Sequence, residues 1–291
     1  MDRILFGDNQ FFGINHMSEE KARQQSMRFA DLAPIMETLR GARNAGVDVF
    51  MCTTHDRIAE VAEVVRDQPE EWAGFKFYPC MPYAHKYANA VTEYGYFDAL
   101  KRFLPGGGLL DAAMRGGKAL LTRDMESVAT LLIDAEMKPF KGLETPIVFV
   151  QNVVTDLILG LGYFEAFKIF ADHIQKRYNA EAGFITMNLP MLLPALDSVG
   201  IRNPIVCANV NKIGFRMSGG IDAYRRATQE WPARVIAMSV LASGAIPPAE
   251  AIEWVVNEPY VRSILFGASS ERNIRSTVDL IHRFDGERMP A

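Results

Sequence analysis

The stretch FITMNLPMLLPALDSVGIRNPIVCA, residues 184–208, decides the fold of this chain. It begins with a short apolar run at 184–187 and ends with another at 204–208, and a segment with helical periodicity lies between them. Short apolar runs separated by a helix are typical of a βαβ unit, in which a crossover helix joins two parallel strands. The stretch therefore predicts two neighbouring strands of a parallel sheet.

The same alternation recurs along the whole chain. Several of the apolar runs are continuous rather than alternating, as expected of strands that are buried on both faces. We predict eight strands, at residues 4–7, 47–52, 75–80, 146–150, 184–187, 204–208, 234–239 and 263–266. Eight strands alternating with helices in a chain of 291 residues favour a closed (β/α)8 TIM barrel of the α/β class over an open doubly wound sheet.

Turn and capping residues mark the helices between these strands. Pro247 and Pro248 suit the first turn of a helix, where a proline loses no intrahelical hydrogen bond. Ser269 and Ser270 are expected N-cap residues of the last helix, which we extend to His282. The other predicted helices cover residues 31–44, 163–178, 218–231 and 249–257.

One connection is longer than a minimal barrel needs. Residues 81–145, between the third and fourth strands, contain two further helical stretches, 94–103 and 124–135, and the glycine cluster PGGG at 105–108. Long connections of this kind are usually lids or contact surfaces. We therefore expect one barrel domain over residues 1–291, with 81–145 as an insertion-like lid or interface segment.

Composition and charge limit the classes of partner. The chain carries 31 Lys+Arg and 35 Asp+Glu, a formal charge of -4, and it has no basic run. Nucleic acids and anionic membranes are bound by clustered basic residues, so we expect neither as a partner. A small-molecule substrate is the expected partner, and a homo-oligomer is compatible with the sequence.

The remaining compositional features favour a cytoplasmic protein. The beginning, MDRILFGDNQ, has charges where a signal peptide needs an apolar core. The most apolar stretch, residues 146–170, is interrupted by polar and charged side chains and is too broken to span a bilayer. Three separated cysteines, Cys52, Cys80 and Cys207, fit a reducing compartment and are expected to be buried apolar residues.

Polar residues gather where the predicted strands end. In a (β/α)8 barrel the active site lies at the carboxyl ends of the strands, because the βα loops meet there. Amide side chains in apolar strand tails need partners if they are buried, which favours a site over solvated loops. The residues concerned are Asp8, Asn9, Gln10, Asn15, His16, Thr53, Thr54, His55, Asp56, Cys80, Tyr83, His85, Lys86, Gln151, Asn152, Thr155, Asp156, Asn188, Asn209, Asn211, Lys212, Ser239 and Ser243.

Three histidines and two lysines in this set offer alternative chemistries. His16, His55 and His85 follow the first three strands, and with an aspartate they would form an acid/base cluster or a divalent-metal site. No local metal motif such as HExxH is present, so we assign no metal ligands. Lys212, and in the same way Lys86, is either an ordinary loop lysine or an amine able to form a Schiff base.

The second half of the chain resembles the aldo-keto reductase superfamily, whose members are (β/α)8 enzymes that use NADPH. The stretch FITMNLPMLLPAL is similar to the family's fifth-strand pattern and places Asn188 at its asparagine. NPIVCANVN resembles the sixth-strand segment and places Asn209 where the family holds the nicotinamide carboxamide. VIAMSVLASGAI resembles the seventh-strand motif, with Ser239 at its serine.

The last match, VRSILFGASSERNI, resembles the loop and helix with which the family binds the phosphate of the adenosine half. The resemblance implies NADP or NAD as a cofactor, and the histidines at the strand ends leave a divalent metal as the other candidate. It also implies an anion site where the last strand meets the last helix, because first-turn N–H groups have no intrahelical acceptor. The residues concerned are Gly267, Ala268, Ser269, Ser270, Arg272 and Asn273.

The four residues on which the family relies for carbonyl reduction are replaced. The corresponding positions here are Met51, Asp56, about Cys80, and Gln151, and Met238 stands where an aromatic residue usually stacks on the nicotinamide. A carbonyl that accepts hydride needs a proton donor, so other residues must supply one. Our candidate catalytic residues are therefore His55, Tyr83, His85, Lys86, Gln151 and Lys212.

Three hypotheses for the function follow. The first is a divergent NAD(P)-dependent oxidoreductase that acts on a small carbonyl compound or a phosphorylated metabolite, with Asn188 and Asn209 directed at a polar ligand in the barrel mouth. The second is a non-redox lyase, aldolase or isomerase that uses a histidine-bound metal or Lys212. The third is an inactive barrel that serves as a regulatory subunit.

Overall fold

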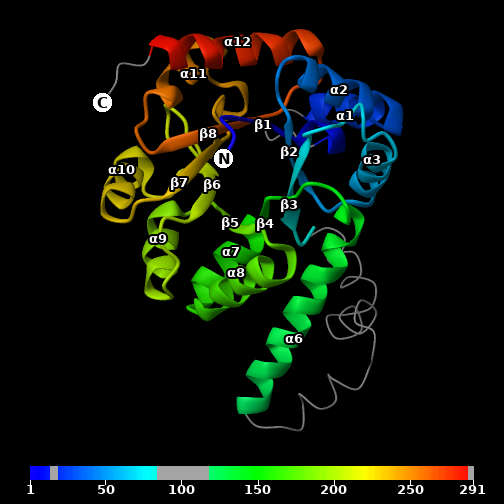
Figure 1. Cartoon of the computed structure of the whole chain (residues 1–291). Helices are drawn as coiled ribbons and strands as arrows, with labels where there is room; N and C mark the ends of the chain where they lie inside the picture. Colours follow the sequence, from blue (N-terminus) through cyan, green and yellow to red (C-terminus); the bar gives the residue numbers. More distant parts are fainter. Residues whose placement is uncertain (14–18, 84–117, 288–291) are drawn as a thin grey trace.

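Eight parallel strands form a closed barrel in which each strand pairs with its neighbours in sequence and the last returns to the first (Figure 1). The computed structural model describes residues 1–13, 19–83 and 118–287 of the chain. The strands are β1 (Ile4–Gly7), β2 (Val49–Thr53), β3 (Lys76–Met81), β4 (Ile147–Val150), β5 (Glu181–Thr186), β6 (Ile205–Asn209), β7 (Arg234–Met238) and β8 (Val261–Phe266).

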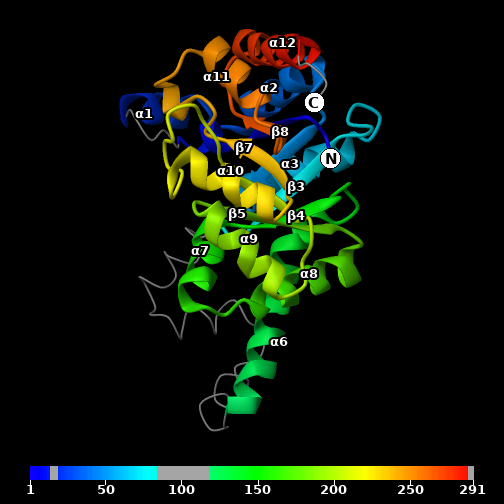
Figure 2. The ribbon, with the colours of Figure 1, turned by 90° about the vertical axis from the view of Figure 1, so that its left-hand side faces the viewer.

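Helices surround the barrel and cover the outer faces of the strands, while α6 extends beyond the barrel on the side away from α12 (Figures 1 and 2). Of the described helices, none is long and apolar enough to cross a membrane. Their bounds are η1 (Asn9–Phe12), α1 (Glu19–Arg28), α2 (Leu32–Asn44), α3 (Asp56–Asp67), α6 (Lys118–Met137), η2 (Lys138–Phe140), α7 (Asn152–Leu161), α8 (Glu165–Tyr178), α9 (Leu189–Ser198), α10 (Gly220–Glu230), η3 (Ala242–Gly244), α11 (Pro248–Val256) and α12 (Glu271–Glu287).

The strands contribute to two separate apolar cores. Alternate side chains point outward and pack against the helices, while the others point inward and fill the barrel, as the two-residue period of a strand requires. The ring of Phe149 from β4 lies over β5 at Gly183, where a Cβ atom would stand 2.2 Å from its Cε1. The barrel interior is therefore a packed core, and its packing requires a glycine at position 183.

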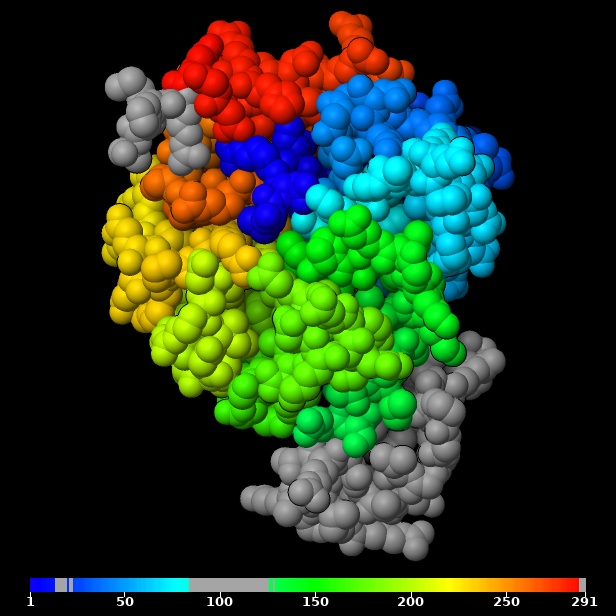
Figure 3. All heavy atoms as spheres, viewed as in Figure 1, coloured from blue at the N-terminus to red at the C-terminus, as the bar shows by residue number. Residues whose placement is uncertain are grey.

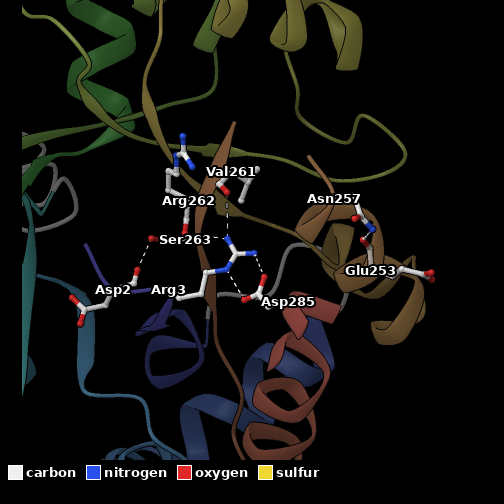
Figure 4. Close-up of polar contacts among 8 residues, drawn as sticks. All are labelled: Asp2, Arg3, Glu253, Asn257, Val261, Arg262, Ser263 and Asp285. Atoms are coloured by element: carbon white, nitrogen blue, oxygen red, sulfur yellow. Dashed lines mark hydrogen bonds and ion pairs between the residues drawn. The ribbon is translucent and has the colours of Figure 1, made fainter. Parts of the chain in front are cut away.

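The amino-terminal end of the barrel is closed by the first residues of the chain, which lie over its centre in Figure 3. The Asp2 carboxylate accepts hydrogen bonds from Lys76 Nζ and Tyr78 Oη, both at 2.9 Å. Its backbone oxygen accepts a hydrogen bond from Ser263 Oγ at 2.5 Å. Arg3 forms two hydrogen bonds to the Asp285 carboxylate in α12 (Figure 4). These contacts leave the opposite end, where the strands terminate, as the place for a site.

The structure confirms the predicted barrel and its eight strands. β1 has the predicted bounds, whereas β5 begins at Glu181 instead of residue 184. This start was missed because Glu181 is exposed and Gly183 has no side chain, so neither gives a strand signal. Likewise α12 continues to Glu287, beyond the predicted end at His282.

The long connection is described only in part. The predicted helix at 124–135 is present within the longer α6, but the predicted helix at 94–103 lies outside the described residues. The single domain over residues 1–291, and the lid or interface role of 81–145, stay predictions.

The contact between Phe149 and Gly183 can be tested by adding one methyl group. We expect Gly183→Ala to lower the free energy of unfolding by about 1–3 kcal/mol, because overpacking forces the ring or the strand to move. Gly160→Ala is the matched control, since Gly160 lies in α7 and a methyl group added there would meet no atom within 4 Å. Urea unfolding of both variants measures the difference, and equal stability of the two would contradict this account of the core.

Candidate active site

A buried acid lies at the carboxyl ends of the strands: Asp8, which directly follows β1 and is 5% exposed. Its Oδ2 accepts hydrogen bonds from the backbone N and the Oγ1 of Thr53 at the end of β2, both at 2.7 Å. A buried carboxyl normally requires such partners. The two bonds hold Asp8 at the mouth, between the first two strands.

Burial raises the pKa of the Asp8 carboxyl above its ordinary value, and the hydrogen bonds from Thr53 oppose this effect without cancelling it. After burial, the charge of Asp8 is the second cause of the raised pKa of Tyr83. It also contributes, again after burial, to the raised pKa of Cys52. Perturbed pKa values of several neighbouring groups are typical of functional sites, which makes this end of the barrel the candidate site.

Three rings lie together beside Asp8. The rings of Phe12 and His55 are 4.3 Å apart, and those of His55 and Tyr83 are 5.1 Å apart. His55 is the N-cap of α3, and its Nδ1 accepts a hydrogen bond from the backbone N of Arg57 at 2.9 Å. The proton of the neutral imidazole is therefore on Nε2, which makes His55 a hydrogen-bond donor. Residues from the loops after the first three strands thus form one cluster.

A second buried acid, Glu136 in α6, lies against the same loops. Its side chain is 4% exposed, and Oε2 accepts hydrogen bonds from Thr54 Oγ1 and, at 3.5 Å, from the backbone N of Tyr83. Sequence reasoning missed Glu136, because it lies in a helix and not at a strand end. Its contacts connect α6 to the loops that carry His55 and Tyr83.

Hydrogen bonds hold the loops that follow β4 and β5. Gln151 is the N-cap of α7, and its Nε2 donates to the backbone oxygen of Cys80 at 3.2 Å. Asp156 accepts hydrogen bonds from Thr186 Oγ1 at 2.5 Å and from the backbone N of Met187 at 3.0 Å. Asn188 is the N-cap of α9, with its Oδ1 accepting from the backbone N of Met191 at 3.4 Å. The side-chain oxygen of Asn188 thus caps the first turn of α9.

The loop after β6 is held by two buried asparagines. Asn209 Nδ2 donates to the backbone oxygen of Arg216 at 3.0 Å and contacts Met187 Sδ at 2.8 Å. Asn211 makes two hydrogen bonds to the backbone of Phe215, at 2.7 and 2.9 Å. Both side chains are at most 1% exposed, so they organise the loop from within. The Nδ2 group of Asn209 is therefore used within the protein, and the predicted ligand role of this residue stays a prediction.

This loop also borders a hollow of about 480 Å³ at the carboxyl ends of β5 and β6, lined by Met187, Gly214, Arg216, Met217 and Ser218. Arg216 is exposed, and its guanidinium lies 5.4 Å from the centre of the Phe215 ring. Within the described part of the chain it has no acidic partner. Sequence reasoning missed Arg216, which no strand-end pattern marks.

The loop after β7 carries three residues in the left-handed backbone region that disfavours side chains. The φ angles of Ser239, Ala242 and Ser243 are 54°, 45° and 59°. Non-glycine residues in this region cost about 1 kcal/mol or more each, and they persist where surrounding structure holds them, often at ligand sites. The predicted cofactor residue Ser239 is thus the first of a strained turn.

The turn between β8 and α12 is used in part by the protein itself. A Cβ atom on Gly267 would stand 2.2 Å from Oε1 of Gln10, a buried side chain held by a bond to the oxygen of Gly7. Ser270 Oγ accepts a hydrogen bond from the backbone N of Asn273 at 3.3 Å, as an N-cap does. Arg272 is exposed on α12, and Ser269 is half-buried. The predicted anion site here stays a prediction.

The other candidates are dispersed. Lys212 is exposed, and its Nζ forms an ion pair with Glu250 Oε1 at 2.7 Å in α11, a setting that does not desolvate the amine. His16, His85 and Lys86 lie outside the described residues. In residues 1–13, 19–83 and 118–287, no group of three or more His, Cys, Asp or Glu side chains is arranged to hold a metal ion.

Comparison with solved structures shows the fold. The chain is similar to a Pseudomonas aeruginosa protein assigned to the aldo-keto reductases, with a TM-score of 0.61, 13% sequence identity, and coverage of 97% of this chain and 90% of that one. It is also similar to an aldose reductase from Giardia lamblia, with a TM-score of 0.53, 11% identity, and coverage of 99% and 88%. A protein described as a 2,5-diketo-D-gluconic acid reductase B gives a TM-score of 0.57 at 11% identity, with coverage of 99% and 88%.

The sequence matches no protein-family model and no curated protein. The similar solved structures nevertheless confirm, at the level of the fold, the resemblance inferred from the motifs. The fold is a (β/α)8 barrel of the kind found in aldo-keto reductases.

We expect the ionised form of Asp8 to lower the stability of the fold. Because burial raises its pKa, the folded protein holds this proton more tightly than the unfolded chain does. The contribution of Asp8 to stability is then fully present below its ordinary pKa of 3.8 and is lost as the pH rises through the folded-state value. We expect Asp8→Asn, which stays neutral, to match or exceed the wild-type Tm, with the difference growing as the pH rises above 3.8.

Thermal unfolding as a function of pH measures this effect. Asp222→Asn is the control, because that carboxylate is 82% exposed and should give no pH-dependent difference. A lower Tm for Asp8→Asn at neutral pH would show that the charge stabilises the fold and would contradict the assignment.

Proposed function

We propose that this chain is an oxidoreductase that reduces a small carbonyl compound with a nicotinamide cofactor, using an acid/base set different from that of the aldo-keto reductases it resembles. The observation that carries the proposal is the cluster of Asp8, His55 and Tyr83 at the ends of the first three strands. These residues lie where a barrel enzyme of this fold has its site, and they replace groups that the sequence has lost.

Tyr83 is the proposed proton donor. Burial first, and the charge of Asp8 second, raise the pKa of its hydroxyl, so Tyr83 is protonated at neutral pH. As a carbonyl is reduced, its oxygen gains negative charge and needs a proton, which a phenol beside a donor ring can supply. His55, in contact with Tyr83, carries its proton on Nε2 and would stabilise the same oxygen.

Asp8 and Glu136 have supporting roles in this scheme. Asp8 provides a buried carboxyl that can return a proton to the cluster, since its raised pKa lies closer to neutrality than that of an exposed aspartate. Glu136 binds the backbone of Tyr83 and the side chain of Thr54, which fixes the two loops relative to each other.

The mouth has features that suit a dinucleotide. NAD(P)H would supply the hydride. The strained turn at Ser239, the exposed guanidinium of Arg216 and the first turn of α12 would bind its polar groups. Arg216, exposed beside the hollow, adds the positive charge that phosphates need.

The Schiff-base alternative receives no support, because the described contacts place the Lys212 amine in an exposed ion pair.

Cofactor binding is the decisive experiment. We expect NADPH or NADH to bind, as measured by quenching of protein fluorescence and by calorimetry, with Asp8→Asn binding the cofactor as well as the wild type does. Absence of binding of either nucleotide would remove the redox hypothesis and leave the fold without an assigned chemistry.

Tyr83 can be tested separately from cofactor binding. With a panel of small aldehydes and ketones, Tyr83→Phe should lower kcat about 100-fold, in the range of a lost general acid, while the Kd for the cofactor is unchanged. Tyr163→Phe is the control, because Tyr163 is exposed on the outside of the barrel. Full activity of Tyr83→Phe would assign the proton to another residue.

A further inference from the structure

A second hollow lies at the opposite end of the barrel, beside the strand starts and away from the candidate active site. Its volume is about 680 Å³, within the range of small-molecule sites. Side chains from α10 and from the starts of β7 and β8 line it, notably Arg225, Arg234 and Arg262. We call it the arginine cavity. Figure 3 shows this end of the molecule, with the amino-terminal residues over its centre.

Two of the arginines are held in place by acids, one of them buried and the other exposed. Arg225 forms two hydrogen bonds to the Glu258 carboxylate, which is 3% exposed, and Arg234 forms two to Glu181. Arg234 Nε also donates to the backbone oxygen of Asn203. A guanidinium has five N–H donors, so each of these arginines keeps N–H groups for a further acceptor. Fixed guanidinium groups lose little entropy when they bind a ligand.

The third arginine, Arg262, gives the cavity a net positive charge. Among the described residues Arg262 has no acidic partner, and its backbone oxygen accepts a hydrogen bond from Arg3 Nη1 at 3.0 Å. In Figure 4 its guanidinium points away from the Arg3–Asp285 pair and has no marked contact. Three guanidinium groups balanced by Glu181 and Glu258 leave one positive charge at the cavity, which Asp222, 4.0 Å from Arg225 and 82% exposed, screens only weakly.

An independent observation comes from Tyr260, which also lines the cavity. Tyr260 is 8% exposed, and its hydroxyl is buried with no hydrogen-bond partner in the described part of the chain. Buried hydroxyls are almost always bonded, so an unpaired one needs an explanation. Burial, and then the charge of Glu258, raise the pKa of this hydroxyl, which keeps it a donor at neutral pH. A bound acceptor would satisfy it.

We propose that the arginine cavity binds the phosphate group of a small organic phosphate. Compact oxyanions with several acceptor oxygens suit a cavity lined by several guanidinium groups, each of which can bond two of the oxygens. The Tyr260 hydroxyl supplies a further donor, and the neutral side chains of Asn203 and Gln229 line the remainder of the cavity. A cavity of about 680 Å³ holds more than the phosphate itself, so the ligand has an organic part, next to Pro232 and Pro259.

Inorganic phosphate is the probe for the test, applied to the full chain. We expect phosphate to raise the Tm above that in sodium chloride of equal ionic strength, because a ligand of the folded state stabilises it. Arg262→Gln should weaken the phosphate affinity roughly tenfold, the size expected for a lost hydrogen bond between charged groups. Calorimetry gives the affinities directly.

Two control variants separate this site from others. Arg226→Gln removes an exposed arginine of the same helix as Arg225 that does not line the cavity. Arg283→Gln removes an exposed arginine of α12 that forms an ion pair with Glu287 and does not line the cavity. Both should bind phosphate like the wild type. A wild type that phosphate does not stabilise, an unchanged affinity of Arg262→Gln, or an equal loss in either control would overturn the proposal.

Tyr260→Phe separates a ligand role from a structural one. Since the hydroxyl has no partner in the described structure, its removal should leave the Tm in sodium chloride equal or higher. The same variant should bind phosphate several-fold more weakly, because it lacks one donor. Wild-type phosphate affinity of Tyr260→Phe, or a loss of stability without phosphate, would show that the hydroxyl serves the fold and would overturn its assignment to the ligand.

Discussion

The closure of the parallel barrel, with β1 bonded to β8, is the constraint on which the rest of the structure depends. A closed barrel has no free strand edge, but it buries every strand on both faces and so requires an interior filled with side chains. The contact between Phe149 and Gly183 shows how tightly the interior is packed. The Phe149 ring occupies the space that a side chain at position 183 would need. Because the interior is packed, polar sites are confined to the two ends of the barrel. Buried acids lie at the carboxyl ends of the strands, whereas arginines line the cavity at the opposite end.

At the carboxyl ends of the strands, polar groups are buried at a cost to the fold. Asp8 is held by Thr53, yet burial still raises its pKa, which means that the ionised form is less stable there than in water. Glu136 is equally buried and joins a distant helix to the loops of the site. Strained residues follow β7. Natural proteins accept such costs at functional sites, and they rarely keep them elsewhere.

The fold could be predicted from the sequence because strands such as IVFV in β4 are continuous apolar runs with helical segments between them. The place of the candidate site followed from the same pattern, since Asp8 and His55 come just after strands and Asn209 ends one. What each side chain binds was not predictable. Asn209 was expected to hold a ligand, but its amide holds the backbone of Arg216, a contact that depends on the path of a loop. Glu136 and Arg216 were missed because their positions depend on tertiary packing alone.

The contacts of the first residues have a consequence for how the protein is made. Arg3 and Asp285 form an ion pair across almost the whole sequence, and β1 completes its hydrogen bonds only with β8. During synthesis on the ribosome, the first strand therefore has one unpaired edge until the last strand and helix have emerged. Contacts so distant in sequence slow folding, and an exposed strand edge promotes aggregation in the meantime. A nascent chain of this barrel thus exposes this strand edge for as long as its final residues are missing.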